Sequence, residues 1–368
     1  MQRRPDGSVS AALAAHIGQE IAREGGWISF ERFMHLALYA PGLGYYARGA
    51  RQFGLLAAGG SDFVTAPELS PYFARALAAQ VAQGLQAAAA DEVWEFGAGS
   101  GALAAELLAT LGPRVRRYTI VEVSAALRAR QQAYLAPFAG RVQWADALPE
   151  TMRGVVVGNE VLDAMPVRLA AFDGTGWRER GVVLHEGAFA WADVPGTLRP
   201  PVEGPFAPGT VTELHLQAQA FVATLAERLE RGLVLLVDYG FPEAEYYHPQ
   251  RTGGTLMCHR AHRADANALA DVGEKDLTAH VDFTAVALAA QDAGLEVAGY
   301  TSQARFLLNC GIAGLLETAS PAERAHAQKL LTEHEMGELF KVIALSRGLD
   351  FGPEGALGFR AGDRTHRL

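Results

Sequence analysis

Acidic side chains stand at the ends of several apolar runs in this sequence. Glu95 lies in "VWEF", directly before a glycine-rich turn, and Glu122 and Asp146 follow at the ends of the next two runs. If these runs are parallel strands, their carboxyl ends meet at one edge of a sheet, where open α/β proteins bind ligands. Carboxylates gathered at that edge would attract a cationic ligand and repel a phosphate.

A fourth apolar run, "GVVVG", leads into an amide and two further acids, Asn159, Glu160 and Asp163. Because Glu160 and Asp163 are three residues apart, we expect one turn of helix to bring them onto one face. Such a pair can hold a guanidinium group through bidentate, charge-assisted hydrogen bonds. The alternative interpretation is a helix N-terminus whose positive end the acids stabilise.

The elements that must position these residues alternate along the chain. Seven apolar runs are typical of strands: "EVWEF", "RYTIVEV", "RVQWA", "GVVVG", "GLVLLVDYG", "LEVAGY" and "FKVIALS". The first two gaps hold the helical patterns "ALAAELLATL" and "SAALRARQQAYLAPF". This alternation predicts an α/β, Rossmann-like fold with a mostly parallel, seven-stranded sheet, in which the fourth strand lies beside the first.

Other segments are expected to surround this sheet. Helices are predicted over 8–24 and 29–39, the second with Ser29 as N-cap, and another starts at Pro71 after the N-cap Ser70. We expect two inserted segments on the substrate side, a β-rich one at about 167–211 and a polar lid at about 240–281. The predicted division is a helical extension with a cofactor-covering loop over 1–90 and a catalytic domain over 91–368.

Composition excludes some classes of protein. The 368 residues carry a net charge of −9, so no general basic face favours a nucleic-acid partner. Two cysteines are too few for a disulfide framework, and no apolar run is long enough to insert into a membrane. Polar residues interrupt the amino-terminal segment, which argues against a signal peptide and for a cytoplasmic protein. The sequence leaves the oligomeric state open, and a homodimer is compatible with it.

The glycine-rich turn fits two cofactors. Gly97, Gly99 and Ala102 match the dinucleotide fingerprint, whereas Gly97, Gly99 and Gly101 after Glu95 match a loop that holds S-adenosylmethionine. A carboxylate at Glu95 would repel a pyrophosphate but attract the cationic amino-acid end of S-adenosylmethionine. Glu122 suits a ribose of either cofactor. Together the acids favour S-adenosylmethionine, with an NAD-dependent oxidoreductase as the alternative.

Two histidine-containing stretches could support other chemistry. Cys258, His259 and His262 lie close in sequence, and the two histidines could share a helix face, but no second pair has matching spacing, so we expect no metal site. His280, before a predicted N-cap at Asp282, is a candidate general base or substrate contact. A buried, hydrogen-bonded structural histidine is an equal alternative at this position.

Several motifs together resemble the MidA-like methyltransferases over nearly the whole chain. The most specific are "DFVTAPELSP" and "GNEVLDAMPV", and others are "ISFERFMHLALYAPGLGYY", "EFGAGSGALAAELL", "YTIVEVSAALRARQ", "LLVDYG", "GEKDLTAHVDFTAVA" and "MGELFKVIAL". The resemblance implies a class I methyltransferase fold that uses S-adenosylmethionine. It also implies a protein substrate, since the mitochondrial member is a complex I assembly factor that methylates an arginine of a complex I subunit. A non-catalytic assembly chaperone is a further alternative.

The resemblance and the pattern of strand ends together define the candidate site. The residues expected to bind the cofactor are Thr65, Pro67, Glu68, Glu95, Gly97, Ala98, Gly99, Gly101, Glu122, Val123, Asp146, Ala147 and Asn159. Asp146 is expected to meet the adenine amino group. The residues expected to act on the acceptor are Glu160, Asp163 and His280.

Overall fold

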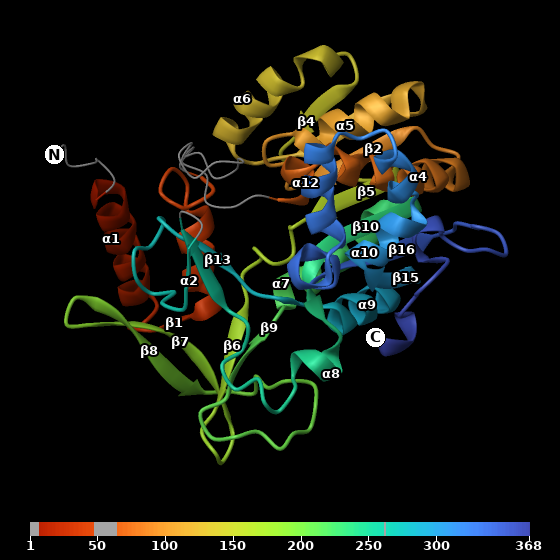
Figure 1. Cartoon of the computed structure of the whole chain (residues 1–368). Coiled ribbons are helices and arrows are strands. Elements are labelled where there is room, and N and C mark those ends of the chain that lie inside the picture. The colour runs from red at the N-terminus through yellow and green to blue at the C-terminus, as the bar shows by residue number, and fades with distance from the viewer. Residues whose placement is uncertain (1–6, 48–64, 261–262) are drawn as a thin grey trace.

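The computed structural model describes residues 7–47, 65–260 and 263–368, and its central feature is one large sheet (Figure 1). Seven strands lie in the order β15-β16-β10-β5-β2-β3-β4, and the short β14 pairs with β10. Their bounds are β2 Glu92–Phe96, β3 Arg117–Val121, β4 Val142–Ala145, β5 Met152–Asn159, β10 Leu229–Phe241, β14 Val281–Asp282, β15 Glu296–Ser302 and β16 Phe340–Arg347. The α/β fold and all seven predicted strands are confirmed.

The strand directions bring the candidate residues to one edge of the sheet. Strands β4, β3, β2, β5 and β10 run parallel, and only β16 runs against its neighbours. As expected, β5 lies beside β2, with Phe96 opposite Gly158, so the glycine turn after β2 and the acids after β5 are adjacent. Strand β10 flanks β5 on the other side, where Val237 faces Asn159.

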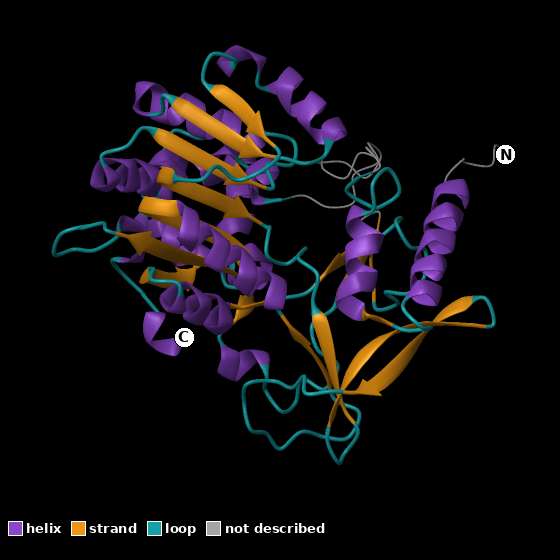
Figure 2. Ribbon diagram, turned by 180° about the vertical axis from the view of Figure 1, so that it is seen from behind, coloured by secondary structure: helices purple, strands orange, loops and turns teal. Residues whose placement is uncertain are grey.

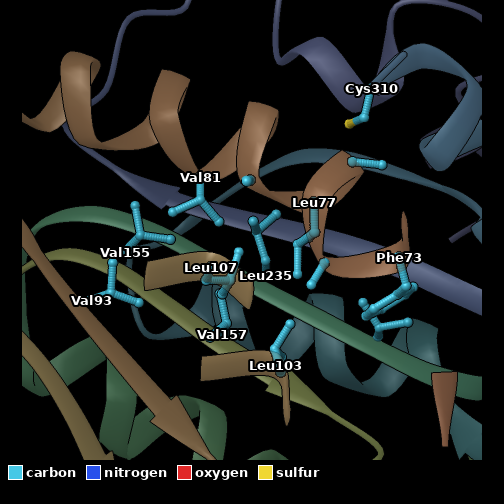
Figure 3. Packing of buried hydrophobic residues seen from close by; sticks show 14 of the residues in the cluster. Phe73, Leu77, Val81, Val93, Leu103, Leu107, Val155, Val157, Leu235 and Cys310 are labelled. Carbon is cyan, nitrogen blue, oxygen red and sulfur yellow. The ribbon is translucent and has the colours of Figure 1, made fainter. Parts of the chain in front are cut away.

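Helices cover both faces of this sheet because the strand residues alternate between two apolar cores. On one face, Val93, Val155 and Leu235 pack against α4 (Pro71–Ala88) and α5 (Ala102–Leu111), as Figure 3 shows. On the other, Val156 and Leu236 pack against α7 (Leu216–Arg228) and α9 (Phe283–Asp292). The helix α4 begins as predicted, since the Ser70 hydroxyl accepts the Tyr72 N–H and Pro71 is the first helical residue.

A second sheet lies to one side of the first (Figure 2). It consists of β1 Ile28–Ser29, β6 Arg168–Phe172, β7 Trp177–His185, β8 Ala188–Pro195 and β9 Val211–Leu214. Helices α1 (Gly7–Arg23) and α2 (Phe30–Tyr39) pack on it through a third apolar core. The predicted N-cap of α2 is confirmed, because the Ser29 hydroxyl accepts the Arg32 N–H at 3.2 Å.

The polar segment expected to form a lid contains a small three-stranded sheet in the order β12-β11-β13. Its bounds are β11 Met257–Arg260, β12 Arg263–Asp265 and β13 Asp276–Thr278. The remaining helices are α3 Ala66–Leu69, α6 Ala125–Tyr134, α8 Glu243–Tyr246, α10 Gln303–Asn309, α11 Ile312–Leu316 and α12 Pro321–Leu331. Short 3-10 or π turns occur at Gly112–Arg114, Ala136–Phe138, Glu333–Gly337, Leu357–Phe359 and Thr365–Arg367.

The division of the chain at residue 90 stays a prediction. Helix α4 precedes that position and packs on the central sheet, whereas α1 and α2 pack on the second sheet. Across residues 7–47, 65–260 and 263–368, no helix combines the length and the apolar character needed to cross a membrane.

Candidate active site

A cavity of about 1010 Å³ lies at the carboxyl ends of β2, β3 and β5. Most of the residues expected from the sequence line it: Thr65, Pro67, Glu68, Glu95, Gly97, Ala98, Gly99, Glu122, Val123, Asn159, Glu160, Asp163 and His280. Three do not: Gly101 is the N-cap of α5, and Asp146 and Ala147 are exposed after β4. The cavity therefore unites the cofactor and acceptor residues, while the proposed adenine contact of Asp146 stays a prediction.

The turn between β2 and α5 requires glycine. Gly97, Gly99 and Gly101 all have positive φ, at 66°, 52° and 89°. A Cβ at Gly97 would also come within 2.8 Å of Val161 Cγ2, in the loop after β5. The backbone can therefore turn here and stay open to a ligand only because these residues lack side chains.

Two of the strand-end acids are buried and held by neutral donors. The Tyr118 hydroxyl donates to Glu95 at 2.7 Å, and burial raises the pKa of Glu95 to about 7. Glu122 accepts the Ser124 N–H at 2.8 Å and a weaker bond from the Gln131 amide, and burial also raises its pKa. Glu122 is thus oriented at the end of β3, where a ribose-binding acid is expected.

The segment that carries Glu160 and Asp163 is not a helix, so both helical interpretations of it are wrong. Glu160 has a left-handed backbone (φ 53°), and the residues after it form an irregular turn. The N–H groups of Val161, Leu162 and Asp163 point to the Asp238 carboxylate, at 2.9 to 3.2 Å. A buried acid on β10, 75 residues away from Asp163 in the chain, therefore shapes this loop in place of a helix.

Both acids of this loop nevertheless face the cavity. Burial, and then the nearby Asp163, raise the pKa of Glu160 to about 8, and burial raises that of Asp163 to about 6. The Asn159 amide donates to Glu160 at 2.9 Å, and the Tyr239 hydroxyl donates to Asp163 Oδ2. The other oxygen of Asp163, Oδ1, is buried without a hydrogen-bond partner, as is Asn159 Oδ1. Such groups suit a bound ligand that donates hydrogen bonds.

His280 lies on the cavity wall between two aromatic rings. Its ring centroid is 5.0 Å from that of Tyr239 and 5.2 Å from that of Phe241. Burial lowers its pKa to about 4, so the imidazole is neutral near pH 7, and its Nδ1 has no hydrogen-bond partner. The expected N-cap next to it is confirmed, because Asp282 accepts the N–H groups of Thr284 and Ala285. The role of His280 toward the acceptor stays a prediction.

Strand β11 carries Cys258 and His259. His259 lies in strand β11 and not in a helix, which corrects the expected shared helix face, and His262 is outside the described residues. Within the described ranges, no three His, Cys, Asp or Glu side chains form a group able to hold a metal ion.

Tyrosines of helix α2 and of the segment after it close the cavity beside the loop acids, and no local sequence pattern indicated this. Tyr39 and Tyr46 stack with centroids 5.6 Å apart, and the Tyr46 hydroxyl donates to Asp276 at 2.9 Å. The Tyr39 hydroxyl donates to the Ala164 carbonyl at 2.8 Å, next to Asp163. The tyrosines of "YAPGLGYY" stand in one of the motifs of the family resemblance, but that motif does not separate core from cavity positions. Tyr45 is fully buried in the core, whereas Tyr46 lines the cavity.

The cavity fits S-adenosylmethionine on its own chemistry. Its glycine turn leaves the backbone open, two acids stand where an amino group and a ribose would lie, and no Lys or Arg of the described residues lines it. Glu95 with Gly97 and Gly99 would hold the amino-acid end, and Glu122 the ribose. When bound, the cofactor supplies an electrophilic methyl group.

Comparison with known proteins agrees with this assignment. Residues 76–301, more than half of the chain, match the model of a family described as "Putative S-adenosyl-L-methionine-dependent methyltransferase". A COG1565 superfamily protein from Burkholderia thailandensis, crystallised with S-adenosyl-homocysteine, is 51% identical with a TM-score of 0.94, and both chains are covered completely. A native crystal structure of a protein of that superfamily from the same organism is 49% identical, with a TM-score of 0.90.

More distant relatives carry a functional name. "Protein arginine methyltransferase NDUFAF7, mitochondrial" from Danio rerio is 28% identical, over 92% of this chain and 87% of the relative. Its Caenorhabditis elegans homologue is 25% identical, over 98% and 94%.

The fold and the cavity define a class I methyltransferase that uses S-adenosylmethionine, which confirms the predicted cofactor over NAD. Within this class, the chain belongs to the MidA-like methyltransferase family.

Proposed function

We propose that this methyltransferase transfers the methyl group to an arginine side chain of a protein, and that the acceptor is a subunit of respiratory complex I. The observation that carries the proposal is the pair of loop acids, Glu160 and Asp163, in a cavity that no Lys or Arg of the described residues lines. Buried carboxylates without basic partners are costly, and a guanidinium would offset that cost. The names of the distant relatives, which are called protein arginine methyltransferases, support an arginine of a protein as the acceptor. The choice of a complex I subunit follows from the family resemblance of the sequence motifs.

The acids also suit the proton balance of the reaction. A guanidinium nitrogen forms a bond to the methyl carbon, the sulfur–carbon bond breaks with its electron pair going to sulfur, and the nitrogen releases one proton. Glu160 would orient the guanidinium. Asp163, with a pKa of about 6, is largely ionised at pH 7 and can accept that proton, whereas Glu160, with a pKa of about 8, can accept it only after the entering guanidinium has made it ionise. Acceleration would come mainly from alignment and exclusion of water by the cavity walls.

Several parts of this proposal go beyond the family assignment. A non-catalytic assembly chaperone is the second candidate, and the intact glycine turn and the buried acids of the cavity favour the enzyme.

The cytoplasmic location expected from the sequence stays a prediction, because the curated relatives named above are called mitochondrial. A homodimer likewise stays a prediction.

Mass spectrometry of complex I subunits tests the proposed acceptor. Subunits from cells with and without this protein are digested, and methylated arginines are compared site by site. We expect one arginine to be methylated only when the protein is present. Complex I that assembles poorly without the protein, yet shows no arginine whose methylation depends on it, would favour the chaperone.

A further inference from the structure

Asp238 stands out among the buried acids because its partners are almost all backbone N–H groups. It follows Val237 near the end of β10 and is 1% exposed. Its Oδ2 accepts the N–H groups of Val161, Leu162 and Asp163 at 3.1, 2.9 and 3.2 Å. Its Oδ1 accepts the Tyr239 N–H at 2.9 Å. One carboxylate therefore satisfies three consecutive donors of a buried loop that has no secondary structure of its own.

The loop needs such a partner. Leu162 and Asp163 are buried, and each buried N–H left without an acceptor costs about 1–3 kcal/mol. Glu160, the residue before the three donors, holds a left-handed backbone that a non-glycine residue keeps only when its surroundings impose it. Its own N–H is tied to the Val237 carbonyl at 2.9 Å, so β10 restrains the loop on both sides of the left-handed residue.

An acid at this place carries an electrostatic cost. Burial, with Asp163 and Glu160 close by, raises the pKa of Asp238, and the N–H groups of Leu162 and Asp163 act in the opposite direction. No described Lys or Arg pairs with Asp238 in a salt bridge, although Lys341 lies opposite it on β16. Burying Asp238 beside Glu160 and Asp163 costs electrostatic free energy. The carboxylate of Asp238 fixes the position of these two loop acids.

We propose that Asp238 is a positioning residue for methyl transfer: its carboxylate holds the backbone of residues 161–163, and this places the Glu160 and Asp163 carboxylates for the acceptor. The role in transfer rests on the proposed acceptor function, whereas the hold on the loop does not. Asp238 does not line the cavity and is not expected to touch cofactor or acceptor.

Amide hydrogen exchange of the full chain saturated with S-adenosylhomocysteine tests the hold on the loop. In Asp238→Asn we expect the amides of residues 161–163 to exchange at least about tenfold faster, and in Asp238→Ala faster still, because the amide keeps one acceptor oxygen and alanine none. Affinity for S-adenosylhomocysteine should stay within about twofold of wild type, since Glu95 and Glu122 are held by Tyr118, Ser124 and Gln131, none of which bonds to Asp238. Unchanged exchange at 161–163 would overturn the proposal.

Asp282→Asn is the matched control. Asp282 is also 1% exposed and accepts two backbone N–H groups at 3.1 Å, but it lies outside this cavity. Its variant should alter exchange at residues 284 and 285 and leave residues 161–163 and transfer unchanged.

The effect on transfer is measured on the acceptor that mass spectrometry identifies. Asp238→Asn should lower kcat with little change in KM for S-adenosylmethionine, and a kcat equal to wild type would overturn the positioning role. If no arginine acceptor exists, the proposed function fails by itself, and a crystal structure of Asp238→Asn with S-adenosylhomocysteine decides instead. If the backbone of Glu160 leaves the left-handed region in the variant, the proposal is supported. If Glu160 and Asp163 keep their wild-type positions in the variant, the proposal is contradicted.

Discussion

At the scale of single residues, the cavity holds acids whose proton affinity burial has raised. Glu95, Glu160 and Asp163 have pKa values of about 7, 8 and 6. Neutral donors hold them: the hydroxyls of Tyr118 and Tyr239 and the amide of Asn159. Such acids take up or release a proton near pH 7 and become charged more readily when a cation enters. This suits a sulfonium cofactor and a guanidinium acceptor.

Glu95 provides a stability test of this burial, because it is 1% exposed. Its pKa is 4.5 in the unfolded chain and about 7 in the folded one, so between these values the folded state binds more protons. Stability contributed by protonated Glu95 is complete below pH 4.5 and falls as pH rises to about 7. Glutamine does not titrate, so the Glu95→Gln variant does not lose this stability. The free energy of unfolding of the variant minus that of wild type should therefore increase by about 3 kcal/mol as the pH rises across that window.

Urea unfolding of both proteins without cofactor, at pH about 4.5 and about 8, measures this change. Other titrating groups are common to the two proteins and cancel in the difference. A difference in free energy that is the same at both pH values would show that Glu95 ionises normally.

At the scale of elements, the strand ends were predictable and the loop after β5 was not. Runs such as "EVWEF" and "GLVLLVDYG" are buried on both faces, and their composition alone predicts strands. The course of residues 160–163 depends on Asp238, which no local pattern connects to them. The spacing of Glu160 and Asp163 predicted a helical turn, and a distant carboxylate imposed a different backbone.

The close approach of β5 to β2 gives a test at this scale. Gly154 has φ 139°, and a Cβ there would lie 2.1 Å from the Glu92 carbonyl oxygen. Gly112 also has positive φ, at 55°, but a Cβ there would meet nothing within 4 Å. We expect Gly112→Ala to cost about 1 kcal/mol from backbone strain alone, and Gly154→Ala roughly 3 kcal/mol or more because the strands must separate.

Denaturant unfolding of the two variants checks this difference. Equal losses of stability would mean that the β5–β2 approach is looser than the distances indicate.

At the scale of the whole molecule, the central sheet, helix α2 with the segment after it, and the small lid sheet meet around one cavity. The cofactor half comes from the central sheet and was predictable from strand ends and the glycine turn. The opposite wall, with Tyr39, Tyr46 and Asp276, assembles from α2, the segment after it and β13. Strand β13 is more than 200 residues away from the other two segments in sequence, and only tertiary packing brings it to them, so this wall was not predictable from one sequence.

Glu160→Gln tests most directly whether the acid loop of this cavity directs methyl transfer to arginine. The purified wild-type chain and the variant are each incubated with deuterated-methyl S-adenosylmethionine and complex I subunits from cells that lack the protein. Mass spectrometry follows the transfer of the deuterated methyl group to the subunits. We predict label on arginine, a transfer rate about 100-fold lower in the variant, equal to about 3 kcal/mol, and an affinity for S-adenosylhomocysteine within about twofold of wild type. Equal rates for the two proteins, or label on another residue type, would contradict the account.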